Sequence, residues 1–381
     1  MEENKTIPLK IFNFDMSIEP PINKFTKSGQ YRFLSWGENN LFPELLLSLY
    51  DAKGSPLHKS CVNRKVKLSA GFGLKDIISP ELMSYVEETD LELLFRFISR
   101  DFEIFNGFSF EVIWNREGTK AKLHYVPIHT LRFGLDETGK EVSDYMWFSK
   151  NWAEFKKKEY EPQYIKRYEP GIRNEKTIYY YTEPNANGLD YYPSPSYSTG
   201  LNYINLDYEI SQYHKNSLAQ GFQPSFMLYF GTGQPEKEEQ DIFHREFLRN
   251  FSSSKNAGKI MLAWGSGQEE KPEMIKIDNT VNDDRFILLR ETIEQAICQS
   301  HEIAPQLVLL SPGSLGNQAE RQELLAEFQL MVIEDRQRQL EKCVNGILKD
   351  MGFTEKVELK NYMDTEVAKQ TQDIQQNNEN I

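Results

Sequence analysis

The spacing of apolar residues predicts helices early in the chain. Over residues 38–105 apolar side chains recur every three or four positions, and Leu91 and Ile98 fall on one face of the last part. Pro56 stands where the first residue of a helix is expected, and Gly71 stands where that helix would end. This part of the chain therefore predicts a succession of amphipathic helices.

Strand-like alternation follows these helices. The stretches "FSFEVIW" and "AKLHYVPI", separated by the turn "NREGTK", predict a β-hairpin. Residues 134–200 are the least regular, and eleven of the nineteen tyrosines lie between Tyr160 and Tyr208. These tyrosines fit either stacking on nucleic-acid bases or a β-rich layer of half-buried strands. The β-rich interpretation is favoured because few basic residues outside Lys156–Lys158 accompany them.

The second half of the chain alternates helices and strands. A helix over 203–222 precedes a β-α-β-β unit within 223–280, whose strands are "PSFMLYF", "GKIMLAW" and "EMIKI". A second helix is expected over 281–303, and a long one over 319–352 after an intervening loop. The polar interval "EDRQRQ" predicts that the two halves of the long helix face different surroundings. The tail "KQTQDIQQNNENI" has the composition of disordered segments.

The glycine-rich loop before the long helix invites a test for nucleotide binding. A phosphate-binding loop needs a lysine to neutralise the phosphates and a hydroxyl to hold magnesium. Gly313 and Gly316 are followed by no such pair, and no lysine occurs between Lys276 and Lys342. Glu320 at the helix start would also repel a phosphate. The sequence therefore excludes a nucleotide cradle here.

Other catalytic patterns are missing from the sequence as well. The six histidines show no H-E-x-x-H spacing, and no G-x-S-x-G nucleophile elbow occurs. Cys61, Cys298 and Cys343 are odd in number and widely spaced, so they predict neither a disulfide framework nor a zinc site. Three cysteines without a signal-peptide core indicate a reducing, cytoplasmic origin. We expect no enzyme activity, no cofactor and no metal.

The charge balance constrains the partners. The formal net charge is −13, whereas a protein that grips nucleic acid through phosphates normally has a basic face. Residues 281–341 hold eleven Asp and Glu against five Arg. An acidic surface repels phosphate and would let DNA slide past, although an ordinary solvated acidic helix explains the charge equally well. Apolar runs are too short to span a bilayer, so no membrane partner is expected.

The order of elements resembles that of the portal (head-to-tail connector) proteins of tailed bacteriophages. The resemblance covers roughly residues 38–352 and is clearest from 192 onward. It is carried by "YYPSPSYSTGLNYINLDYEISQYHKNSLAQGFQPSFMLYF", then "NAGKIMLAWG", "DDRFILLRETIEQAICQSHEIAPQLVLL" and "GSLGNQAERQELLAEFQ". These are patterns rather than invariant motifs, and their specificity comes from their order and spacing.

The resemblance implies an α+β protomer with named parts. In chain order these are an N-terminal wing region 1–202, with an irregular β-rich part at 134–200, a stem helix 203–222, a β-α-β-β clip 223–280, a second stem helix 281–303, a tunnel-loop region 304–318, a long wing helix 319–352 and a short C-terminal segment 353–381 with a disordered tail and a minimal crown. The channel residues that it implies form the tunnel loop: Ser311, Gly313, Ser314, Leu315, Gly316, Asn317 and Gln318.

The resemblance also implies a function. Such a protein forms a dodecameric ring at one vertex of the capsid, a channel for DNA packaging and ejection. The ring contacts the major capsid protein and docks the terminase packaging motor and the head-completion adaptor, while double-stranded DNA passes without sequence-specific binding. The expected location is the portal vertex of the virion, after assembly in the host cytoplasm. Two alternatives stay open: a nucleic-acid-processing enzyme with an unrecognised site, and another ring or scaffold protein.

Overall fold

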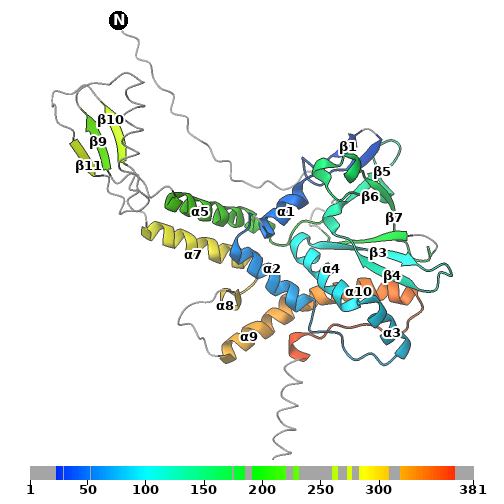
Figure 1. Cartoon of the computed structure of the whole chain (residues 1–381). Coiled ribbons are helices and arrows are strands. Elements are labelled where there is room, and N and C mark those ends of the chain that lie inside the picture. Colours follow the sequence, from blue (N-terminus) through cyan, green and yellow to red (C-terminus); the bar gives the residue numbers. More distant parts are fainter. Residues whose placement is uncertain are drawn as a thin grey trace, which may run out of the picture. The chain divides into compact units, whose positions relative to one another are not determined.

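The computed structural model of this protein divides into two compact units (Figure 1). Unit 1 comprises Met1–Asn205 and Glu294–Ile381, and unit 2 comprises Leu206–Ile293. The structure describes residues 23–28, 30–51, 53–173, 176–184, 191–219, 226–230, 260–264, 273–276, 283–308 and 318–364. The fold is mixed α+β, as the sequence predicts.

Unit 1 is built on an eight-stranded sheet of order β1-β2-β5-β6-β7-β8-β3-β4. The strands are β1 (Phe25–Ser28), β2 (Tyr31–Leu34), β3 (Gly107–Trp114), β4 (Ala121–Tyr125), β5 (Leu131–Leu135), β6 (Val142–Phe148), β7 (Gln163–Arg167) and β8 (Lys176–Thr182). Neighbouring strands run antiparallel except β7 and β8, which are parallel. The predicted hairpin is confirmed as β3 and β4, in which Phe110 pairs with Tyr125.

The stretch 134–200 is more regular than its sequence pattern indicates. It contributes β6, β7 and β8 to the same sheet, and β8 pairs with β3 along its whole length. Its tyrosines stack on aromatic residues of the protein itself. Tyr179 lies 4.9 Å from Phe110 between ring centroids, and Tyr181 lies 5.0 Å from Phe108. These contacts favour the β-rich interpretation of the tyrosines over base stacking.

The helical segment predicted at 38–105 consists of α1 (Phe42–Tyr50), α2 (Pro56–Ser69), α3 (Pro80–Thr89) and α4 (Leu91–Phe105). Local capping chemistry sets the boundaries. The Ser55 hydroxyl accepts a hydrogen bond from the backbone N–H of His58, 3.2 Å away, and so caps α2. Asp90, at φ +48°, separates α3 from α4 and accepts from the N–H of Leu93. A single periodic pattern thus becomes two helices at one left-handed residue.

The main core of unit 1 joins elements from both ends of the chain. Figure 1 shows α4 and α10 (Glu334–Asp350) near β3 and β4, and α2 packs against α4 and α10. Phe95 and Ile98 of α4 pack with Phe110 of β3 and with Val344 of α10, and all four are buried. Leu359, after α10, lies in the same cluster and bridges to Leu74. The segment after α10 therefore completes the core.

The long helix predicted at 319–352 is interrupted. It consists of α9 (Gln318–Phe328), a π-helical turn η5 (Gln329–Ile333) and α10. The buried Gln329 amide donates to the Gln337 carbonyl oxygen at 3.0 Å, and the Gln337 amide donates to the backbone oxygen of Leu68 at 3.2 Å. These bonds tie the π turn to α2. They give a physical basis for the expectation that the two halves face different surroundings.

Unit 2 contains a three-stranded sheet of order β10-β9-β11. Its strands are β9 (Phe226–Phe230), β10 (Ile260–Trp264) and β11 (Glu273–Lys276), where the sequence predicts three strands. β10 is parallel to β9, and β11 is antiparallel to it. The helix of the predicted β-α-β-β unit lies outside the described residues. Helices α5 (Leu201–Ala219) and α7 (Asp283–Ser300) each continue from one unit into the other.

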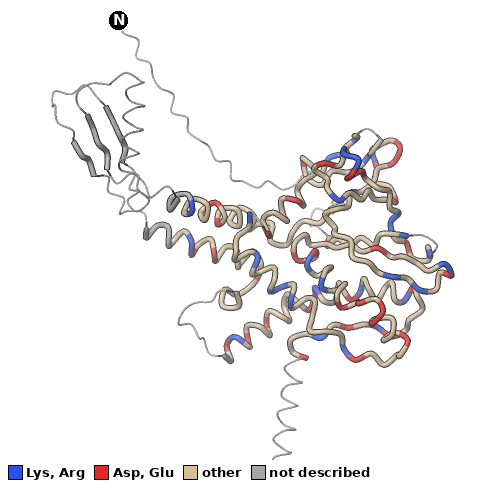
Figure 2. The backbone as a smooth tube through the Cα atoms, viewed as in Figure 1, with Lys and Arg blue, Asp and Glu red and all other residues tan. Residues whose placement is uncertain are grey.

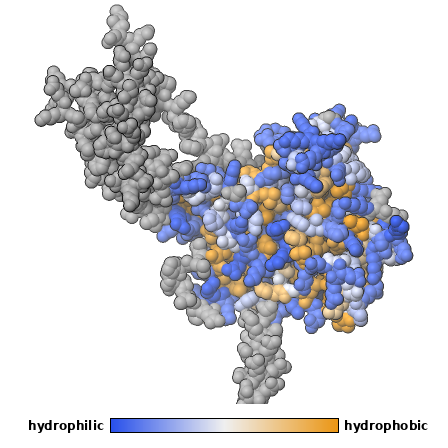
Figure 3. Space-filling view, viewed as in Figure 1, coloured by the Kyte–Doolittle hydropathy of each residue, from blue (hydrophilic) through white to orange (hydrophobic). Residues whose placement is uncertain are grey.

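The described surface mixes charged and apolar side chains. Figure 2 shows acidic and basic residues interspersed along the described tube, and Figure 3 shows apolar residues that reach the surface between polar ones. Ile78 is 89% exposed, Met331 73%, Leu330 66% and Leu288 65%. Among the described residues, no helix combines the length and the apolar character needed to cross a membrane.

One arginine is enclosed at the junction of β5 and α1. The Arg132 side chain is fully buried, and its guanidinium lies 4.9 Å from the ring centroid of Trp152 and 5.6 Å from that of Trp36. It donates to both the side-chain and the backbone oxygen of Asn40, at 2.5 and 2.8 Å, and it pairs with Glu44 at 3.4 Å. A buried cation is tolerated only when its donors are satisfied, and the planar fork of arginine satisfies several acceptors at once.

Replacing Arg132 by lysine tests whether its guanidinium contacts stabilise the fold. We expect Arg132→Lys to lower the free energy of unfolding by about 3 kcal/mol, because a lysine cannot reach these acceptors together and leaves buried oxygens unpaired. Urea unfolding followed by circular dichroism measures the change. Arg64→Lys, at an exposed position of α2, is the matched control and should change stability by less than about 0.5 kcal/mol. Equal effects of the two substitutions would contradict the role assigned to Arg132.

Candidate functional site at the base of α5 and α7

The start of α5 and the end of α7 lie against each other in unit 1. A Cβ atom added at Gly200 would stand 2.2 Å from the Ser300 hydroxyl oxygen, so only glycine permits this approach. Leu201, Ile204 and Ile297 are buried beside it. The place where the chain departs toward unit 2 and the place where it returns are thus fixed by close packing.

The end of α7 is closed by a Schellman motif. The N–H of Ile303 donates to the oxygen of Cys298 at 3.1 Å, and the N–H of Glu302 donates to the oxygen of Gln299 at 3.0 Å. Glu302 has φ +55°, a conformation that glycine usually supplies. The turn directs His301 back into the protein, where its side chain is 1% exposed.

Three aromatic side chains meet at this base. His58 of α2 and His301 face each other with Nδ1 and Nε2 2.9 Å apart, so one ring donates and the other accepts. The Tyr197 ring lies 4.8 Å from the ring of His58 and 4.7 Å from that of His301, between centroids. The Tyr197 hydroxyl donates to the oxygen of Ile104 in α4 at 2.8 Å. The trio joins α2, α4, the segment before α5 and the end of α7.

Burial keeps both imidazoles neutral. It lowers the pKa of His58 from 6.5 to about 3, and the positive charge of Lys65 acts in the same direction. It also lowers the pKa of His301 far below its usual range, helped by His58 and Lys65. At near-neutral pH, a hydrogen bond between two neutral imidazole rings therefore joins α2 to the end of α7.

An ion pair lies beside the trio on the same face of α2. The Lys65 ammonium stands 3.1 Å from a carboxylate oxygen of Glu103 in α4, and both side chains are buried. Positions 58, 61 and 65 are spaced by three and four residues, so α2 presents one buried face with two polar side chains. Each has one partner on a neighbouring element, which offsets part of the cost of burial, while His58 Nε2 and the Glu103 carboxylate oxygens have no hydrogen-bond partner among the described residues.

Asp101 in α4 illustrates how other buried polar groups are used. Its carboxylate oxygens accept from the Tyr125 hydroxyl at 2.8 Å and from the N–H of Ile128 at 2.9 Å. Burial raises the pKa of Asp101 to about 7, against the opposing effect of these two bonds. The group is held by structural contacts to β4 and to the turn after it.

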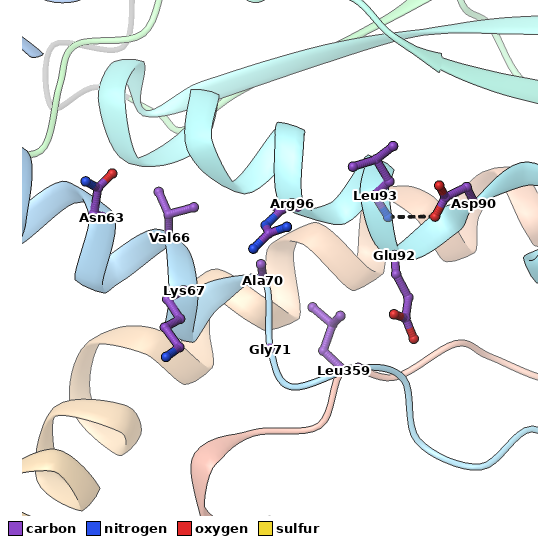
Figure 4. Close-up of a pocket in the computed structure, with 11 residues that line it drawn as sticks. Asn63, Val66, Lys67, Ala70, Gly71, Asp90, Glu92, Leu93, Arg96 and Leu359 are labelled. Atoms are coloured by element: carbon purple, nitrogen blue, oxygen red, sulfur yellow. Dashed lines mark hydrogen bonds between the residues drawn. The ribbon is translucent and has the colours of Figure 1, made fainter. Parts of the chain in front are cut away.

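A surface pocket of about 710 Å³ lies between α2, the start of α4 and the segment around Leu359 (Figure 4). Lys67 and Arg96 line one part of it, and Asp90 and Glu92 line another. Asp90 is already engaged as the cap of α4. The described residues also contain no group of three or more histidine, cysteine, aspartate or glutamate side chains able to hold a metal ion.

The channel residues predicted from the sequence are not tested by this structure. Positions 311–317 lie outside the described residues, and Gln318 is the first residue of α9, known by its backbone alone. The exposed side of α9 carries Glu320, Arg321 and Glu323. Sequence reasoning missed the His58, Tyr197 and His301 trio, because residues separated by up to 243 positions carry no local pattern.

The buried imidazoles predict that the free energy of unfolding depends on pH. A histidine whose pKa is depressed on folding contributes stability that is present above pH 6.5 and lost as the pH falls toward the folded value. For His58, with a folded pKa of about 3, the loss between pH 7 and pH 5 is about 2 kcal/mol, and His301 adds in the same direction. We expect His58→Gln/His301→Gln to flatten the fall in unfolding free energy over this range.

Urea unfolding at pH 5, 6 and 7 measures this slope, with exposed His124→Gln as control. Asp101, whose raised pKa adds stability as the pH falls below about 7, opposes the trend. His129, whose pKa burial lowers to about 4, reinforces it. Asp101 and His129 are present in every variant, so the effect of the histidine pair is the difference in slope between the double variant and the wild type. Parallel slopes in the double variant and the wild type would contradict the assignment.

The chain was compared with known protein families, curated proteins and solved structures. No model of a known protein family matches the chain, and no curated protein does. Solved structures do match. A chain in the virion of a native gene transfer agent (GTA) particle has a TM-score of 0.57 at 14% identity, covering 87% of each chain.

Two neck structures match as well. A chain in the neck of an empty GTA particle, computed with C6 symmetry, has a TM-score of 0.54 at 14% identity and 84% coverage of both chains. A chain in the neck of a native GTA particle, computed with C12 symmetry, has a TM-score of 0.54 at 13% identity, covering 84% of this chain and 83% of that chain. The protein therefore has the fold of chains from GTA virions and necks, which confirms at the level of the fold its predicted resemblance to head-to-tail connectors.

Proposed function

We propose that this protein is the portal of a tailed phage or phage-like particle, a ring at one capsid vertex through which DNA is packaged and ejected. The observation that carries the proposal is the fold match to GTA virion and neck chains over more than four fifths of both partners. The order of elements along the sequence supports it independently. The role is structural, and the ring performs no chemistry of its own.

The proposed assembly is a homo-oligomeric ring of twelve subunits. One of the matching neck structures was computed with C12 symmetry and another with C6 symmetry, which supports a ring. Exposed apolar side chains support it as well. On α7, the apolar residues Ile293 and Ile297 are buried. The neighbouring Leu289 is 39% exposed and Leu288 is 65% exposed. In a ring, one patch of each subunit meets a different patch of the next, and such a contact would cover these leucines.

The elements take the following parts in the proposed portal. Helices α5 and α7 are the stem helices expected at 203–222 and 281–303, and the sheet of unit 2 belongs to the clip at 223–280. Residues 304–318 form the tunnel-loop region, and the interrupted helix from α9 to α10 is the wing helix expected at 319–352. The exposed glutamates of α9 continue the acidic character of residues 281–341, which favours sliding of DNA over binding.

The proposed partners follow from these parts. The clip docks the terminase packaging motor and later the head-completion adaptor, and the outer part of the ring contacts the major capsid protein. Double-stranded DNA passes along the channel without sequence-specific contacts. The ring assembles in the host cytoplasm and resides at the portal vertex of the virion.

Solution mass tests the ring. We expect the purified protein to assemble into particles of about twelve times 44.6 kDa. Neighbouring ring sizes should also be present, because a heterologous contact closes only when the rotation between subunits is right, and the capsid is not there to fix it. Leu288→Glu/Leu289→Glu should shift the population to single subunits, since carboxylates would be buried at the contact. Mass photometry measures both, with Ile78→Glu as an exposed control that should leave rings intact. A wild-type protein that stays monomeric at micromolar concentration would sink the proposal.

Charge substitution tests the tunnel loop. Ser314→Lys/Gln318→Lys should impair DNA packaging, because two lysines in each of twelve subunits place about 24 cations along the path of the phosphates. The defect should be strongest at low salt, since each phosphate contact releases counterions. A packaging assay on rings verified by electron microscopy measures it, with Ser314→Asn/Gln318→Asn as a neutral control. Normal packaging by the lysine variant at low ionic strength would place the loop outside the channel.

A further inference from the structure

Two of the three cysteines meet in the folded protein. Cys61 lies in the middle of α2 and Cys298 in the last turn of α7, and their side chains are 0% and 1% exposed. Both are free thiols in this structure. The odd number and wide spacing of the cysteines predicted no pairing. The fold nevertheless brings together two that are separated by most of the chain.

The histidine contact explains why these cysteines are neighbours. His58 precedes Cys61 by one helical turn on α2, and Cys298 precedes His301 by one turn at the end of α7. The imidazole contact of 2.9 Å thus lies one helical turn from each cysteine, and the two thiols interact with each other. The packing of Gly200 against Ser300 holds the end of α7 in this position.

The two thiols are also chemically unequal. A hydrogen bond between them raises the pKa of Cys61, and burial adds to that rise. The same hydrogen bond lowers the pKa of Cys298, against the effect of burial. Cys61 is therefore the donor and Cys298 is the sulfur that more readily becomes a thiolate, the form that reacts with oxidants.

We propose that Cys61 and Cys298 form a reversible disulfide when the folded protein meets a hydroperoxide, joining α2 covalently to the end of α7. The Cys298 thiolate attacks one peroxide oxygen, the O–O bond breaks, and the hydroxide that leaves takes up a proton to become water. Cys298 is then a sulfenic acid. The Cys61 sulfur displaces its hydroxyl group, which leaves with the Cys61 proton as a second water. Two thiols lose two electrons, and one hydrogen peroxide is reduced to two waters.

The two thiols already interact before oxidation. A disulfide needs sulfurs about 2.05 Å apart, so hydrogen-bonded thiols have only to approach further. The oxidant must reach sulfurs that are almost fully buried, which a small molecule such as hydrogen peroxide can do when the end of α7 opens transiently. We expect oxidation over minutes to hours rather than seconds. The bond should raise the melting temperature by several degrees, because it closes a long loop in the unfolded chain.

Cys343 provides an internal control. It is also buried, at 4% exposed, but it belongs to the core between the sheet, α4 and α10. Burial raises its pKa to about 11, which suppresses the thiolate. Cys343 should therefore remain a thiol under conditions that join the other two.

The experiment uses the full-length protein, oxidised with hydrogen peroxide, alkylated in denaturant and mapped by mass spectrometry. We expect one peptide pair linked through Cys61 and Cys298, an alkylated Cys343, and loss of two of three titratable thiols. Dithiothreitol should restore all three thiols and reverse the rise in melting temperature. Cys343→Ser should still form the link, and Cys61→Ser should leave a sulfenic acid at Cys298 that dimedone traps.

Three free thiols after prolonged oxidation would overturn the proposal. So would a disulfide that includes Cys343, or links only between separate chains. The main result comes from the wild-type protein, so an unfolded serine variant does not decide the outcome. The inference rests on unit 1 alone and stands whether or not the protein forms a ring.

Discussion

The contact between His58 and His301 sets a constraint on which the arrangement of unit 1 depends. The chain departs toward unit 2 at Asn205 and returns at Glu294, and the first and last turns of the connecting helices must meet beside α2. A neutral imidazole pair, a buried tyrosine and a glycine with no room for a Cβ atom define that meeting point. Directional hydrogen bonds fix the relation of the helix ends more narrowly than apolar packing alone would.

Polar contacts between elements recur at several other buried groups of unit 1. Arg132 satisfies acceptors on two elements, Lys65 pairs with Glu103, and the Gln329 and Gln337 amides link the π turn to α2. None of these contacts is a strong source of stability, because desolvation offsets most of the attraction. Their effect is specificity: a misplaced helix would leave a charge or an amide unpaired. These polar groups therefore hold neighbouring elements of unit 1 together.

The fold match extends over most of the chain at low sequence identity. Similarity to GTA virion and neck chains covers 84 to 87% of this chain, although sequence identity is only 13 to 14%. At that identity shared packing geometry survives while individual residues are replaced. Large apolar residues are left exposed on α7 and η5.

The sequence by itself determined the local elements. Apolar periodicity predicted α2, α4, the β3–β4 hairpin and the three strands of unit 2, and the lack of a lysine after Gly316 excluded a nucleotide loop. It did not predict β1, β2 or β5, nor the π turn that interrupts the long helix. Only the tertiary structure decided which distant residues meet, such as His58 with His301 and Cys61 with Cys298. Apolar periodicity indicates that one face of a helix or strand is buried. It does not indicate which remote segment packs against that face, because packing between distant segments leaves no pattern in the local sequence.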